Sequence, residues 1–128
     1  MSGRPITVDD LLTEARTGVE RLEPAAALTA MTAGDILVDI RSESQRERDG
    51  TIPGAHFIPR SVLEWRLDPR CEHRDPKAAK PGVRVILICH EGFQSSLAAA
   101  TLRRLGVDAA DVVGGFVAWQ AAGLPVER

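Results

Sequence analysis

The stretch VRVILICHEGFQSS, residues 83 to 96, decides the fold of this chain. Its first half is apolar for most of its length, which is typical of a strand that is covered on both faces of a sheet. The run ends at Cys89, and a loop that contains Gly92 separates it from Ser95 and Ser96, a pair suited to capping a helix. We therefore predict a buried strand, a loop over the amino end of the next helix, and Cys89 at their junction.

Further apolar runs on either side of this stretch predict a fold that contains both strands and helices. Short strands are expected at residues 36–39, 56–58 and 110–113, and helices after each of them. The first helix is expected to begin after Thr7 and to end near Leu22, where a short extended piece leads into a second helix with Pro24 at its first position. Strands that alternate with helices indicate an α/β fold, a parallel sheet with helices on both faces. Residues 1–19 are expected to be an N-terminal helical extension, and residues 20–128 the main domain.

The composition excludes several classes of function. The chain has 128 residues with a net charge of −2, so it lacks the basic surface expected of a protein that binds nucleic acid or an anionic membrane. No apolar run reaches the roughly 18 residues that a spanning helix needs, and the N-terminus lacks the apolar core of a signal peptide. A cytoplasmic location is therefore expected.

The two cysteines, Cys71 and Cys89, are expected to be free thiols in a reducing compartment. His73 and His90 lie near them, but the spacings match no zinc pattern, so we expect no metal and no cofactor.

Cys89 has two competing interpretations. A lone cysteine at the end of an apolar strand is often a small buried hydrophobic residue. However, ligands of open parallel sheets bind beyond the carboxyl ends of the strands, and Cys89 lies at such an end. The loop N–H groups and the dipole of the following helix would favour an anion there, and Gly92 would let the loop tighten. This pattern favours a thiolate nucleophile that forms a covalent adduct.

Five blocks of sequence resemble the single-domain rhodaneses, a sulfurtransferase family. They are ILVDIR (36–41), GTIPGAHFIP (50–59), CHEGFQSS (89–96), AAATLRRLG (98–106) and VVGGFVAWQAAGLPV (112–126). The resemblance implies a five-stranded parallel sheet flanked by helices on both faces. It also implies that Cys89 takes a sulfane sulfur from a small donor and passes it to a thiol or to cyanide, with protein thiols among the candidate acceptors. The loop that would hold the persulfide comprises His90, Glu91, Gly92, Phe93, Gln94 and Ser95.

The chain departs from the family pattern at Gln94, where the loop usually carries arginine. Glutamine offers no charge and no bidentate fork to a sulfonate, which argues against thiosulfate as the natural donor. Positive charge is expected instead from Arg60 or Arg66, with Trp65 as an apolar wall. Asp39 and Arg41 are expected to support the active loop through hydrogen bonds.

Two other functions compete with sulfur transfer. One is a phosphatase on the same fold, which the absence of a loop arginine disfavours. The other is a non-catalytic or regulatory binding module, which the retained Cys89 disfavours. Cys71 is expected to be a bystander, with resolution of an oxidised Cys89 as its alternative role.

Overall fold

The computed structural model describes residues 3–128 and contains one parallel sheet of five strands, as predicted. The strands are β1 (Glu20–Leu22), β2 (Ile36–Asp39), β3 (His56–Phe57), β4 (Val85–Ile88) and β5 (Ala109–Val112), in the spatial order β1-β5-β4-β2-β3. Because all the pairings are parallel, the carboxyl ends of the strands lie at one edge of the sheet. The central strand β4 therefore delivers Cys89 to that edge between β5 and β2.

Side chains of the central strands alternate between two hydrophobic cores. In β4, Val85 and Leu87 enter one core, whereas Ile86 and Ile88 enter the other. This period-2 alternation of an entirely apolar strand is what burial on both faces produces. The helices are α1 (Val8–Thr17), α2 (Pro24–Thr32), α3 (Glu43–Asp49), α4 (Leu63–Leu67), α5 (Gln94–Arg104) and α6 (Gly115–Ala121).

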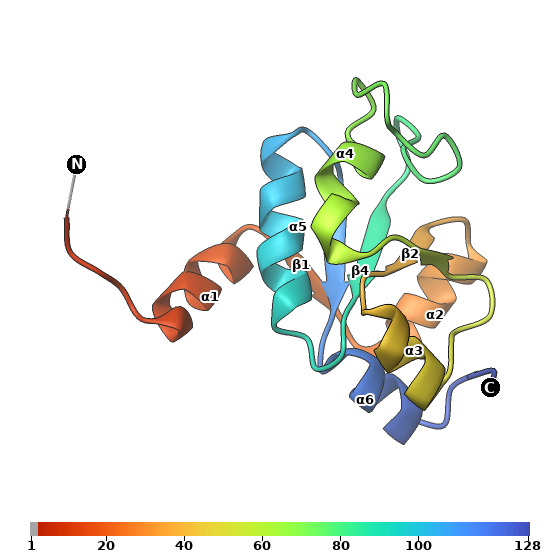
Figure 1. Cartoon of the computed structure of the whole chain (residues 1–128). Coiled ribbons are helices and arrows are strands. Elements are labelled where there is room, and N and C mark those ends of the chain that lie inside the picture. Colours follow the sequence, from red (N-terminus) through yellow and green to blue (C-terminus); the bar gives the residue numbers. More distant parts are fainter. Residues whose placement is uncertain (1–2) are drawn as a thin grey trace.

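The two cores lie under different helices. Leu63 of α4 and Leu102 of α5 belong to the core of Leu87, and Ala27 of α2 and Trp119 of α6 belong to the core of Ile86. Helices therefore cover both faces of the sheet, and Figure 1 shows this arrangement around β4. The predicted fold class is confirmed.

The N-terminal part differs from the prediction. Thr7 caps α1 through a capping box with Asp10, as expected, but the helix ends at Thr17 instead of near Leu22. Residues 20–22 form the edge strand β1, which pairs with β5. Helix α1 buries none of its residues; its C-terminal end lies next to α5, and its N-terminal end extends away from the domain (Figure 1). Met1 and Ser2, the first residues of the predicted extension, lie outside the described residues.

The start of α5 also corrects a prediction. Ser95 and Ser96 do not cap this helix, since it begins at Gln94 and its N-cap residue, Phe93, makes no side-chain capping bond. Both serines are instead fully buried in the first turn, where their hydroxyl groups bind Asp111. Strand β5 buries the Asp111 carboxylate, and the two serine hydroxyl groups donate the hydrogen bonds that a buried carboxylate needs.

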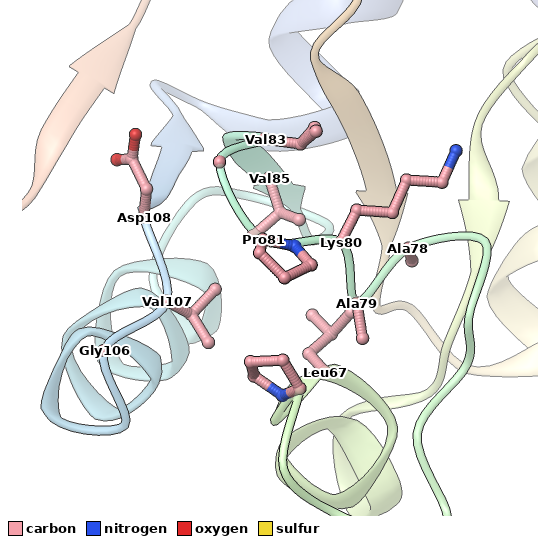
Figure 2. A pocket seen from close by; sticks show the side chains of 12 residues that line it. Leu67, Ala78, Ala79, Lys80, Pro81, Val83, Val85, Gly106, Val107 and Asp108 are labelled. Atoms are coloured by element: carbon pink, nitrogen blue, oxygen red, sulfur yellow. The ribbon is translucent and has the colours of Figure 1, made fainter.

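A small cavity of about 90 Å³ lies at the opposite end of the sheet from Cys89 (Figure 2). Val85 at the start of β4 and Asp108, just before β5, line it together with Leu67 and the loop that carries Pro81. Its lining holds no cysteine, serine or threonine. Within residues 3–128, no helix has the length and apolar character that a membrane-spanning segment requires.

Candidate active site

Cys89 lies at the bottom of a loop that donates hydrogen bonds to its sulfur. The backbone N–H groups of Gly92 and Ser95 lie 3.1 Å and 3.3 Å from Sγ, and the thiol donates to Oγ of Ser95 at 3.3 Å. Only 5% of Cys89 is exposed. The two N–H donors form an anion-binding arrangement, because each places a partial positive charge against the sulfur.

Glycine is required at two positions next to this sulfur. Gly92 has φ +89°, and a Cβ there would lie 2.8 Å from the backbone nitrogen of Gly114. Gly115 has φ +61°, and a Cβ there would lie 2.6 Å from the carbonyl oxygens of Cys89 and His90. Only glycine fits such close approach at a positive φ. The turn after β5 therefore packs directly against the Cys89 loop, and Phe116 N–H donates to the Cys89 carbonyl at 2.8 Å.

An open pocket of about 380 Å³ lies above Cys89. The predicted loop residues His90, Glu91, Phe93 and Gln94 line it, together with residues that the sequence reasoning missed, Ile40 and Gln45. The Nδ1 atom of His90 is buried, has no hydrogen-bond partner among the described residues, and lies 4.0 Å from Oδ2 of Asp49. The predicted loop therefore lies around Sγ of Cys89 and borders the pocket above it.

Of the three residues predicted to receive the donor, the structure brings only Arg60 to the pocket. Its Nη1 donates to both carboxylate oxygens of Glu64, at 2.8 and 2.9 Å, and its Nε is buried without a hydrogen-bond partner among the described residues. One edge of this guanidinium is thus held by Glu64, while the side chain borders the space above Cys89.

Trp65 and Arg66 lie elsewhere, which corrects the prediction. Arg66 donates to the carbonyl of His73 at 2.7 Å, and Trp65 lines a surface depression with Cys71. Arg60 lies in a short 3-10 helix at residues 60–62, whereas Trp65 and Arg66 lie further along in α4, where consecutive side chains point in different directions. Both cysteines are free.

Asp39 and Arg41 support the site less directly than predicted. They form a buried bidentate ion pair at 2.8 and 3.0 Å, and Arg41 also donates to the Gly50 carbonyl. Their hydrogen bonds reach no residue of the loop 89–95; instead, the Arg41 guanidinium lies 3.8 Å from the ring centroid of Phe116. Arg46 of α3 also donates to Asp39 at 3.3 Å, so the pair joins the end of β2 to α3 and contacts Phe116, the neighbour of the loop.

A charged network beneath the loop was missed by the sequence reasoning. Asp111 is fully buried and accepts hydrogen bonds from Ser95 (2.7 Å), Ser96 (2.8 Å) and Arg21 (3.0 Å). Arg21 lies directly opposite Asp111 in the pairing of β1 with β5. The available signal was Asp111 itself, because a single aspartate in an apolar strand needs a buried partner.

Two arginines of this network bind the loop. The Gly92 carbonyl accepts hydrogen bonds from Arg16 (2.8 Å) and Arg21 (3.0 Å), and Arg16 also donates to Ser96 at 3.0 Å. Burial lowers the pKa of the Arg16 guanidinium, as does the neighbouring Arg21, whereas Asp111 and Cys89 act in the opposite direction. Arg16 is therefore within electrostatic reach of both the carboxylate and the sulfur.

Comparisons with known proteins agree with this architecture. The family model of the rhodanese-like domain matches residues 23–122. No curated protein matches the chain. A solved structure from Rhodopseudomonas palustris, a protein of unknown function and possible tyrosine phosphatase, is 34% identical with a TM-score of 0.86, over 98% of this chain and 100% of that one.

Two further solved structures share the fold. A rhodanese-related protein from Thermoplasma volcanium is 25% identical with a TM-score of 0.67, over 84% of this chain and 96% of that one. A thiosulfate sulfurtransferase from Pseudomonas aeruginosa is 26% identical with a TM-score of 0.64, over 85% of this chain but only 19% of that one. The chain belongs to the rhodanese-like domain family.

Proposed function

We propose that this protein is a sulfurtransferase that carries a sulfane sulfur as a persulfide on Cys89. The observation that carries the proposal is the pair of backbone N–H groups, from Gly92 and Ser95, directed at Sγ beneath an open pocket. Such donors stabilise an anionic sulfur, which is the nucleophile in the first step and the resting form of the product. Membership of the rhodanese-like family supports the same reaction.

The reaction proceeds in two displacements at sulfur. The Cys89 thiolate attacks the outer sulfur of the donor; a new S–S bond forms, the donor's bond to that sulfur breaks, and its electron pair leaves with the rest of the donor. An acceptor thiolate or cyanide then attacks the outer sulfur of the persulfide. The bond to Sγ breaks, and its electron pair regenerates the Cys89 thiolate.

The pocket constrains the donor. Gln94 lines it where a charged loop side chain would bind a sulfonate, so thiosulfate is disfavoured as the natural donor. Arg60 is the cation that borders the pocket, and it is proposed to bind an anionic group of a small donor. The proposed acceptors are cyanide or a thiol, including protein thiols. The net charge of −2 argues against nucleic acid or membrane partners, and the proposed location is the cytoplasm.

The description of the R. palustris protein as a possible tyrosine phosphatase raises a competing activity. Phosphate transfer needs a guanidinium that clamps the equatorial oxygens, but residues 90–95 include no arginine. Arg16 and Arg21 lie beneath the loop and donate to the Gly92 carbonyl, so they are engaged away from the pocket. These contacts favour sulfur transfer over phosphate transfer.

Mass spectrometry of the intact protein tests the proposal. After incubation with thiosulfate, mercaptopyruvate or a small persulfide, the wild type should gain one sulfur atom, and Cys89→Ser should gain none. Cys71→Ser is the matched control, since it removes the other free thiol and should load normally. A folded wild-type protein that takes up no sulfur from any donor would refute the enzyme and favour a binding module. Hydrolysis of an aryl phosphate that depends on Cys89 would favour the phosphatase.

A further inference from the structure

The Cys89 loop is held by two residues outside the segment that defines the family. The rhodanese-like match begins at residue 23, whereas Arg16 belongs to α1 and Arg21 to β1. Both side chains nevertheless donate to the Gly92 carbonyl. The N-terminal helix thus contacts the middle of the loop that surrounds the sulfur.

These contacts fix the loop backbone on both sides of Gly92. The Gly92 N–H donates to Sγ at 3.1 Å, and its carbonyl accepts from the two arginines. Since the peptide is trans, and C=O and N–H of a trans peptide point in opposite directions, fixing this carbonyl also turns the Phe93 N–H away from the arginines. The arginines therefore orient the peptide between Gly92 and Phe93, which directly follows the Gly92 N–H that binds Sγ, at a residue that is intrinsically flexible.

Positive charge exceeds negative charge among the three charged groups beneath the loop. Arg16 and Arg21 contribute two positive charges, and Asp111 contributes one negative charge, buried between Ser95 and Ser96. One positive charge remains close to Cys89. Burial lowers the pKa of Arg16, but the nearby Cys89 acts in the opposite direction, which agrees with this arrangement.

We propose that Arg16 is a positioning residue of the Cys89 loop. Arg16 supplies a positive charge from beneath the loop, whereas Gln94, within the loop, supplies none. Arg16 holds the Gly92 carbonyl and favours the anionic sulfur without touching the donor, because it does not line the pocket above Cys89. As a role in sulfur transfer, this inference rests on the proposed function. As a role in the reactivity of Cys89, it is testable without any sulfur donor.

The test compares Arg16→Met and Arg16→Lys with the wild type in the full chain. Arg16→Met should slow alkylation of Cys89 by iodoacetamide at neutral pH about two- to fivefold, because the thiolate is the reacting form and loses one nearby charge. Hydrogen exchange of the amides of residues 90–95 should become faster by the same factor of about two to five. Arg16→Lys retains the charge and should alkylate closer to the wild-type rate. Arg104→Met is the matched control; it removes one exposed charge from α5, and both rates should equal those of the wild type.

Kinetics of sulfur uptake separate a positioning role from donor binding. Arg16→Met should lower kcat for persulfide formation and leave the donor KM unchanged. Because α1 buries no residues, the variant should keep its fold, which circular dichroism verifies. Wild-type alkylation and exchange rates in Arg16→Met would overturn the proposal, and so would an Arg16→Lys variant as slow as Arg16→Met. If the wild type takes up no sulfur while the alkylation and exchange differences persist, the sulfurtransferase proposal fails and the positioning role stands.

Discussion

Ser95 donates its hydroxyl proton to Asp111 across 2.7 Å, although the two residues belong to different elements and are 16 positions apart in the chain. Both side chains are fully buried. The same serine donates its backbone N–H to Sγ of Cys89. The buried carboxylate and the candidate nucleophile are therefore linked through one residue.

Ser95→Ala should lower the free energy of unfolding by about 1 to 3 kcal/mol, because the buried Asp111 carboxylate loses one of its hydrogen-bond donors. Urea denaturation measures the change. Ser61→Ala is the control at an exposed serine, and it should stay within about 0.5 kcal/mol of the wild type. Equal stability of the two variants would show that the Ser95 hydroxyl is not needed to satisfy Asp111.

Arg60→Ala should raise the KM for an anionic sulfur donor about three- to tenfold and change kcat less, because Arg60 borders the pocket above Cys89. Steady-state kinetics across donor concentrations provide the measurement. Arg66→Ala is the matched control, because Arg66 is bound to the His73 carbonyl and should leave the KM unchanged. A raised KM in Arg66→Ala with an unchanged KM in Arg60→Ala would instead place the donor next to Arg66 of α4.

Gln94→Arg should lower the KM for thiosulfate about three- to tenfold, because it adds a bidentate guanidinium to the lining of the pocket. Gln94→Lys adds the same charge without the planar fork and should have a smaller effect. Initial rates with thiosulfate and cyanide distinguish the two. An unchanged KM in Gln94→Arg would mean that residue 94 does not face the donor.

Gly115→Ala should lower the free energy of unfolding by more than about 3 kcal/mol, because the added Cβ would lie 2.6 Å from two loop carbonyls at a positive φ. Gly123→Ala is the control: its φ is also positive, at +73°, but its Cβ would meet nothing within 4 Å. The conformational cost alone, about 1 to 2 kcal/mol, is expected there. Equal losses in thermal or urea unfolding would contradict the close approach at Gly115.

The sequence predicted the sheet well because its central strands are buried on both faces. Continuous apolar runs at residues 36–39 and 85–88 reflect that burial, and the chain positions of Cys89, Gly92 and Ser95 predicted the loop. The edge strand β1 lies where the sequence predicts the end of a helix followed by a short extended piece. Its three residues, ERL, are largely polar and partly exposed, and they become a strand only by pairing with β5.

The support beneath the loop could not be predicted because it depends on long-range pairing. Arg16 lies 76 positions before Gly92, and Arg21 lies 90 positions before Asp111. Each of these arginines has an ordinary local sequence context. Arg60 and Arg66 were equally plausible partners of the pocket, and only the structure separates them: Arg60, just before α4, borders the pocket, whereas Arg66, within α4, binds the His73 carbonyl.

The pairing of β1 with β5 also determines where the cooperative folding unit begins. A chain trimmed to residues 23–122 would contain the whole family match but would leave β5 as an unpaired edge. Exposed strand edges are templates for intermolecular pairing, and Asp111 would be left as a buried charge without Arg21. We expect such a fragment to aggregate, and the autonomous domain to begin before the segment by which its family is recognised.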